Sequence, residues 1–170
     1  SEEKVIYVSG NYNNISSNGA TSNVESGSDT LYVYEISGNN NTIASNNADD
    51  NNGGSEVYVY YVSGDDNLLT SNQVGSSNYN YGSADVYGIY VSGGNNTLSS
   101  NSNSNGIYDD NGQSLYGTYI SGDENVITDD TATSLSSSGA VYALYIGGNL
   151  NVVNGSSSDY GGHTVTSDSR

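Results

Sequence analysis

Apolar and polar residues follow the same order six times along the chain. Each repeat opens with a short segment rich in Val, Ile, Leu and Tyr and reaches a glycine that usually follows a serine. These residue types favour β-strands, so the pattern predicts a strand before each glycine. The glycines are Gly10, Gly38, Gly64, Gly93, Gly122 and Gly148, spaced 28, 26, 29, 29 and 26 residues apart.

Three further positions are nearly constant in the six units. An aliphatic residue stands two positions before each glycine: Val8, Ile36, Val62, Val91, Ile120 and Ile146. An asparagine stands three positions after it: Asn13, Asn41, Asn67, Asn96, Asn125 and Asn151. A second aliphatic residue stands five positions after it: Ile15, Ile43, Leu69, Leu98, Ile127 and Val153.

The segments between these positions are rich in Ser, Asn, Asp and Gly, which favour turns. A period of 26–29 residues with two or three short strands fits one coil of a β-solenoid, in which each coil pairs only with its neighbours. The sequence therefore predicts an all-β fold. Residues 1–155 form a solenoid of about six coils, and residues 156–170 form a polar tail that can add a strand to a neighbouring subunit.

The repeat resembles a known kind of coil. Segments such as VYGIYVSGGNNTLSSN and LYVYEISGNNNTIASN are similar to NosD-like β-helix repeats and to the passenger domains of bacterial adhesins and autotransporters. The shared pattern, G-I-Y-[VIL]-S-G-x-N-N-[TV]-[IL], is clearest from Gly88 to Leu98, and the resemblance covers about Glu3 to Gly155. It implies a right-handed parallel β-helix, an extracytoplasmic setting, and adhesion or assembly. The chain departs from these families because its loops show no regular third strand.

Strict alternation of side chains in the strands predicts two apolar faces. If the residue two before each glycine points inward, the column that begins with Lys4 and Tyr32 also points inward. The outward set then forms an assembly or binding face: Tyr7, Tyr61, Tyr90, Tyr119, Tyr145, Val57, Val86 and Leu115. An exposed apolar patch usually marks an interaction site, although loops or the tail can cover it. The inside and outside assignments are also open to reversal.

The asparagine column predicts a structural ladder. Asn residues stacked along the axis can bond to one another, as in cross-β ladders, and at a turn they can satisfy backbone groups. No capping element is recognisable at either end of the repeat array. Unpaired β edges are templates for further pairing, and a head-to-tail contact that does not close produces a filament.

Charge and composition exclude several classes of partner. The net charge is −17, with only two basic residues, so nothing can neutralise nucleic-acid phosphates or an anionic membrane surface. No apolar run is long enough for membrane insertion, and cysteine is absent. His163 is the only histidine, so the sequence predicts no enzyme. A glycosidase with paired carboxylates is the catalytic alternative.

No cofactor is certain, but the acidic loops suggest calcium. Ca²⁺ takes six to eight oxygen ligands from Asp, Asn and carbonyl groups. The candidate ligands are Asp49, Asp50, Asp65, Asp66, Asp109, Asp110, Asp123, Asp129 and Asp130. No EF-hand or RTX motif is present, and loose screening of the negative charge is the alternative.

Together these features predict a structural subunit of an extracellular filament or surface fibre, a homopolymer built by end-to-end stacking of uncapped coils. The rival prediction is a cell-surface adhesin or carbohydrate-binding module whose tyrosine ladder binds glycans. A tailspike-like enzyme that cleaves glycans is a further alternative.

Overall fold

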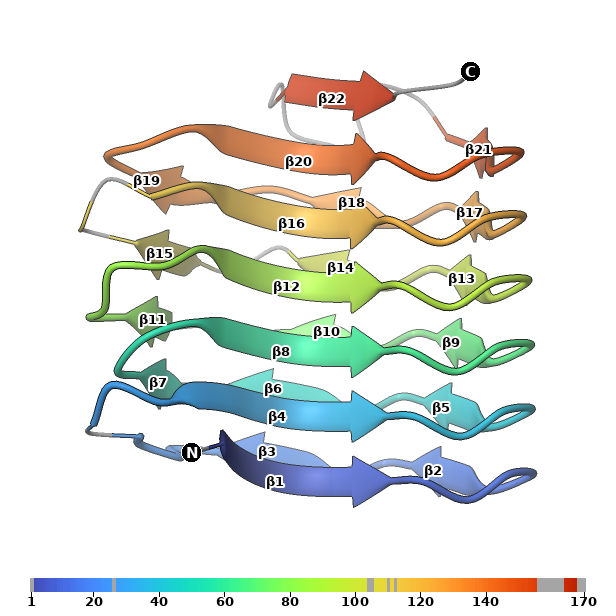
Figure 1. The fold of residues 1–170 in the computed structure, drawn as a ribbon, viewed down its shortest axis with the longest axis horizontal. Coiled ribbons are helices and arrows are strands. Elements are labelled where there is room, and N and C mark those ends of the chain that lie inside the picture. Colours follow the sequence, from blue (N-terminus) through green and yellow to red (C-terminus); the bar gives the residue numbers. More distant parts are fainter. Residues whose placement is uncertain are drawn as a thin grey trace.

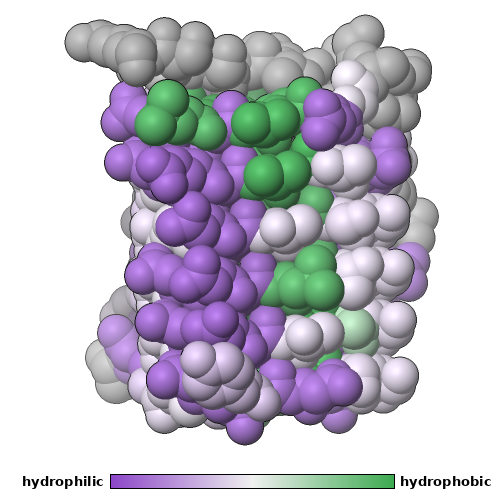
Figure 2. All heavy atoms as spheres, turned by 90° about the vertical axis from the view of Figure 1, so that its right-hand side faces the viewer, coloured by the Kyte–Doolittle hydropathy of each residue, from purple (hydrophilic) through white to green (hydrophobic). Residues whose placement is uncertain are grey.

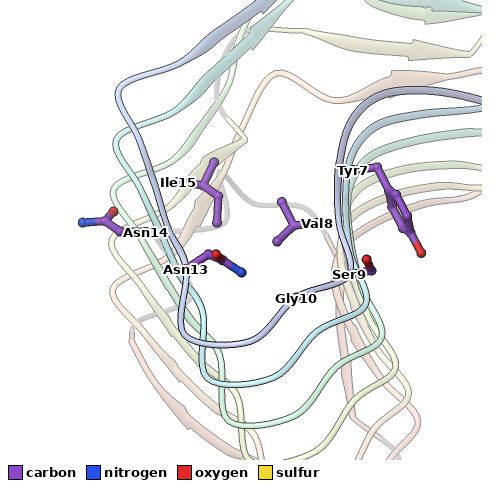
Figure 3. A pocket seen from close by; sticks show the side chains of 7 residues that line it. All are labelled: Tyr7, Val8, Ser9, Gly10, Asn13, Asn14 and Ile15. Atoms are coloured by element: carbon purple, nitrogen blue, oxygen red, sulfur yellow. The ribbon is translucent and has the colours of Figure 1, made fainter.

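The computed structural model describes residues 2–25, 27–103, 106–109, 111 and 113–155, and the backbone of 164–167. Within these residues the chain forms strands and turns with no helix, and every strand pairing is parallel. The strands stack in chain order along one axis, and the coil is right-handed (Figures 1 and 3). The predicted parallel β-solenoid is confirmed.

Four parallel sheets form the sides of the coil. Sheet 1 contains β1 Glu2–Val8, β4 Thr30–Ile36, β8 Val57–Val62, β12 Val86–Val91, β16 Leu115–Ile120, β20 Val141–Ile146 and β22 Thr164–Ser167. Sheet 2 contains β2 Asn14–Ser16, β5 Thr42–Ala44, β9 Leu68–Thr70, β13 Thr97–Ser99, β17 Val126–Thr128 and β21 Val152–Asn154. Sheet 3 contains β3 Gly19–Thr21, β6 Asn47–Asp49, β10 Gln73–Val74, β14 Ser102–Asn103 and β18 Thr131–Ala132. Sheet 4 contains β7 Asn52–Gly53, β11 Asn78–Asn80, β15 Ile107–Asp109 and β19 Ser136–Ser137.

The sheets correct two expectations. The segments expected to be irregular form sheets 3 and 4, so the third side is regular. The described part of the sixth unit supplies strands to sheets 1 and 2 but not to sheets 3 and 4, so the solenoid makes about five turns and not six.

The core is a column filled by the same positions in successive coils. The aliphatic residues before the glycine and those five after it are buried from the second to the fifth coil. Tyr34 and Tyr60 are fully buried, with ring centroids 4.7 Å apart. The Tyr34 hydroxyl lies within hydrogen-bond distance of the Asn18 and Asn47 carbonyls, and that of Tyr60 donates to Gln73. These inward tyrosines agree with the predicted alternation.

The alternation fails in the first half of each long strand. Val57, Val86 and Leu115 were expected on the outer face but are fully buried. The reason is a bend in the strand (Figure 1), where Val59 and Tyr60 are both buried although they are consecutive. The register with the next strand skips Val59 and its equivalents. Because side chains alternate strictly only along a straight strand, the bend reverses the assignment of the residues before it.

Candidate functional site

The outer face of sheet 1 carries two columns of stacked tyrosines, called here the tyrosine face. Column 1 contains Tyr32, Tyr58, Tyr87, Tyr116 and Tyr142, and column 2 contains Tyr61, Tyr90, Tyr119 and Tyr145. Ring centroids within a column lie 4.8–5.2 Å apart with nearly parallel planes. In-register parallel pairing produces this array, because it repeats each position at the strand spacing of about 4.8 Å.

The two columns also contact each other. Tyr58 and Tyr61 meet edge to face with centroids 5.1 Å apart, and Tyr87 and Tyr90 do the same. Column 2 was predicted to point outward, and it does. Column 1 was expected inside, but the strand bend places it outside beside column 2. Stacked and edge-to-face aromatic pairs each contribute about 0.5–1.5 kcal/mol beyond area burial, so the face also stabilises the coil.

Charged residues replace tyrosine in the first two coils. Lys4 holds the column 1 position of the first coil, and Glu35 holds the column 2 position of the second. The Lys4 Nζ lies 2.8 Å from a Glu35 carboxylate oxygen and 4.7 Å from the centroid of Tyr7. The hydrogen bond to Glu35 raises the pKa of Lys4 above its usual value. Tyr7 continues column 2 in the first coil and is 53% exposed.

The hydroxyls of column 1 meet carboxylates at the start of the strands. The Tyr87 hydroxyl donates to Asp85 over 3.3 Å. Burial raises the pKa of Tyr87 and of Tyr58, and it raises that of Tyr32 to about 12. The hydroxyls of Tyr32, Tyr58 and Tyr87 therefore stay protonated at physiological pH.

Asparagine columns form three corners of the coil. In the predicted column, the backbone N–H of each Asn donates to the Oδ1 of the Asn in the next coil over 2.7–2.8 Å, from Asn13 through to Asn151. These bonds join successive coils at the positions where the sequence predicted a structural ladder. A second column runs through Asn18, Asn46, Asn72, Asn101 and Asp130, and a third through Asn23, Asn51 and Asn78.

Sequence reasoning missed the second and third columns, although the chain carries a signal for them. Asn recurs every five residues in the first coil, at Asn13, Asn18 and Asn23. The residue before each of these has a positive φ, namely Tyr12, Ser17 and Ser22. Small polar residues tolerate this conformation, so Asn at a spacing of five residues, preceded by Ser at the second and third corners of the first coil, marks the corners.

The glycine column has a steric origin. A Cβ added at Gly38, Gly64, Gly93, Gly122 or Gly148 would lie 2.0 Å from the carbonyl oxygen of the glycine in the coil before it. Real atoms do not approach so closely. The fixed glycine therefore allows backbones of successive coils to pass in contact, which is one of the established uses of glycine.

The N-terminal end of the solenoid is open. A shallow hollow lined by Val8, Gly10, Asn13 and Ile15, among others, faces the end of the rod (Figure 3). Val8 and Ile15 point into the interior but remain partly exposed, whereas Ile36 and Ile43 one coil later are buried. Among the described residues, no strand pairs with the outer edges of β1, β2 and β3.

The C-terminal end is covered in one place. β22 pairs with β20 of the same chain, whereas the sequence suggested that the tail adds a strand to a neighbouring subunit. Sheet 2 ends on β21, where Val152 and Val153 are 48% and 38% exposed. Leu150, in the preceding turn, is also exposed. Figure 2 shows the hydrophobic surface at this end and a hydrophilic band along the loops below it.

The acidic candidates do not converge. Among the described residues, no group of three or more His, Cys, Asp or Glu side chains is arranged to hold a metal ion. Asp65 and Asp123 each accept a backbone N–H from the next coil, and Asp109 accepts bonds from Asn111 and Ser137.

The remaining candidates hold separate corner positions. Asp50, Asp66 and Asp129 have positive φ, and Asp49 bonds to Asn47. Asp130 belongs to the second asparagine column. Asp110 lies outside the described residues. Several of the described carboxylates thus bond to neighbouring coils, and the described candidates form no common group that could hold a metal ion.

The fold defines the protein as a parallel β-solenoid with an aromatic outer face. Comparison with protein-family models, curated proteins and solved structures gave no match. Within the described residues there is no helix of the length and hydrophobicity needed to cross a membrane.

Proposed function

We propose that the protein is a structural subunit of an extracellular filament or surface fibre, in which copies stack end to end. The observation that carries this proposal is the open first coil. Three parallel sheets begin there with an unpaired edge, and the core residues Val8 and Ile15 remain partly exposed. Free strand edges with apolar side chains beside them favour pairing with another chain.

The ends of the rod also match each other. Val153 is the last residue of the aliphatic column that begins with Ile15, and Asn151 is the last of the column that begins with Asn13. In a head-to-tail stack the N–H of Asn151 would donate to the Oδ1 of Asn13 in the next copy, as it does between coils. The contact is heterologous and need not close, so it generates a filament.

The tyrosine face is assigned to lateral contacts between filaments. Beyond Lys4 and Glu35 in the first two coils it carries a pair of tyrosines in each coil, from Tyr58 and Tyr61 to Tyr142 and Tyr145, so a neighbouring rod would meet a repeated aromatic surface over these coils. In this proposal the chain is a structural protein and has no catalytic function.

Replacing Ile15 by aspartate is expected to abolish elongation. The variant places a charge at the open end of the core, where a stacked copy would bury it without a partner, and burial of an unpaired charge is costly. Asn14→Asp is the matched control, because Asn14 lies in the same strand and points outward (Figure 3). Electron microscopy of both variants and the wild type, after long incubation at high concentration, measures the effect.

Filaments of the wild type and of Asn14→Asp should show an axial repeat of about 24–29 Å, the height of five to six coils at about 4.8 Å each. Circular dichroism should show that Ile15→Asp keeps its strand content. Normal filaments from Ile15→Asp would show that stacking does not use the first coil.

The tyrosine face supports a second candidate, a carbohydrate-binding adhesin. Sugars bind aromatic side chains through the ring faces, but here the rings of a column use much of their faces on one another. We therefore expect no glycan binding by the monomer on a glycan array. Binding that is lost in both Tyr90→Ala and Tyr119→Ala would favour the adhesin.

A further inference from the structure

β22 lies along the edge of β20 at the C-terminal end of sheet 1. We propose that β22 occupies the place where β1 of an incoming copy would pair, so that the tail strand restrains assembly until it is displaced. This inference rests on the proposed function, because it assumes that copies stack end to end. The partner at this edge is a second copy of the chain.

The pairing of β22 differs from every other pairing in sheet 1. The other neighbouring strands are joined by five or six residue pairs, and both strands skip one residue at the bend. β22 has four pairs with β20, and its register shifts between Tyr142 and Leu144. In β20, Ala143 stands between the paired residues Tyr142 and Leu144, whereas their partners in β22 are consecutive. β22 therefore has no residue opposite Ala143. It therefore cannot follow the bend of its neighbour.

β1 has the register that β22 lacks. It pairs with β4 through six residue pairs, and like β20 it has one residue, Val5, that is skipped at the bend. In the place of β22, it would put Lys4 opposite Tyr142 and Tyr7 opposite Tyr145. At these register positions β22 has Thr164 and Thr166.

Contacts inside the chain show which interactions Lys4 and Tyr7 would make at these positions. Tyr7 would extend column 2, whose rings stack at about 5 Å from Tyr61 to Tyr145. Lys4 would lie over the ring of Tyr142, as it now lies 5.6 Å from the ring centroid of Tyr32. A cation over an aromatic face contributes about 0.5–1 kcal/mol at exposed sites.

The other columns continue across the same junction. Gly10 would pack on the carbonyl of Gly148, as each glycine packs on the one before it. The exposed Val153 would be covered by Ile15. An incoming copy thus reproduces contacts that the chain already makes five times, whereas the register of β22 with β20 has four residue pairs.

A double proline variant, Val165→Pro with Thr166→Pro, tests the inference in the full chain. Successive N–H groups of a strand point to opposite edges, so one of the two prolines must remove a donor that faces β20. The control is Asp168→Pro with Ser169→Pro, which makes the same change after the end of β22. Static light scattering measures the concentration at which each protein assembles, and electron microscopy identifies the product.

The β22 variant is expected to assemble at a concentration about tenfold lower than the wild type and the control. The reason is that molecules in which the edge of β20 is free to pair with β1 of another copy are no longer a minor population. Filaments that form equally well from all three proteins would overturn the role of β22 and leave end-to-end stacking intact. Absence of filaments from all three would overturn the proposed function and this inference together.

Discussion

Replacing Gly93 by alanine is expected to lower the free energy of unfolding by roughly 3 kcal/mol or more. The new Cβ would lie 2.0 Å from the carbonyl oxygen of Gly64 and 2.6 Å from its carbonyl carbon. Both atoms are backbone, and the neighbouring coils fix them by hydrogen bonding, since Ser92 N donates to Val62 O and Ser121 N to Val91 O. The clash can be relieved only by separating two coils. Urea unfolding followed by circular dichroism measures the loss.

Gly94→Ala is the matched control for this variant. The nearest atom to its added Cβ is the carbonyl oxygen of Asp123 at 3.3 Å, which requires a shift of a few tenths of an ångström. The position accepts a side chain, because the equivalent residues of the other five units are Asn11, Asn39, Asp65, Asp123 and Asn149. We expect a change within about 0.5 kcal/mol. Equal unfolding midpoints for the two alanine variants would contradict the close backbone contact assigned to the glycine column.

Replacing Asp130 by asparagine is expected to stabilise the protein above pH 7. Burial raises the pKa of Asp130 to about 7, although Asn101 donates to its carboxylate. In the unfolded chain the pKa is about 3.9. Between these values the folded state keeps a proton that the unfolded state has lost, so the contribution of Asp130 to stability falls as the pH rises from about 4 to about 7. A shift of about three units corresponds to a loss of up to about 4 kcal/mol.

Asparagine should remove this loss, because Asn46, Asn72 and Asn101 fill the same column with neutral side chains. Asp129→Asn removes the same formal charge from the exposed neighbouring residue and serves as the control. Urea unfolding at pH 5 and at pH 8 should give a gain for Asp130→Asn that is larger at pH 8. If both variants change stability by the same amount at each pH, then net charge and not burial of Asp130 controls the effect.

The sequence was sufficient to predict the six strands of sheet 1 that belong to the repeats, and their register, but not β22. Six copies of Ser-Gly or Gly-Gly with an aliphatic residue before it align the coils without ambiguity, and in-register stacking then follows from the periodic core. The side of the sheet on which Tyr58 and Val57 lie could not be predicted in the same way. Their assignment depends on a bend between Tyr58 and Tyr60. The sequence does not reveal this bend, because Val and Tyr occur on both faces of the strand.

The candidate site was predicted in part for the same reason. Column 2 lies after the bend, three residues before the glycine, so alternation from the inward aliphatic residue two before the glycine gave the correct side for Tyr61 and Tyr90. Column 1 lies before it and was placed inside. The pairing of β22 with its own chain was missed because a four-residue strand that lacks the glycine and asparagine positions carries no trace of the repeat.

The length of this rod can change independently of its cross-section. Each coil bonds only to the coil before and the coil after it, so no contact depends on how many coils there are in total, and stability becomes a sum of units and of interfaces between neighbours. Gain or loss of one whole unit of 26–29 residues would leave the glycine and asparagine columns in alignment and change only the height of the molecule. A gene for such a protein can thus change the reach of its product by duplication or deletion of a repeat, without solving a new folding problem.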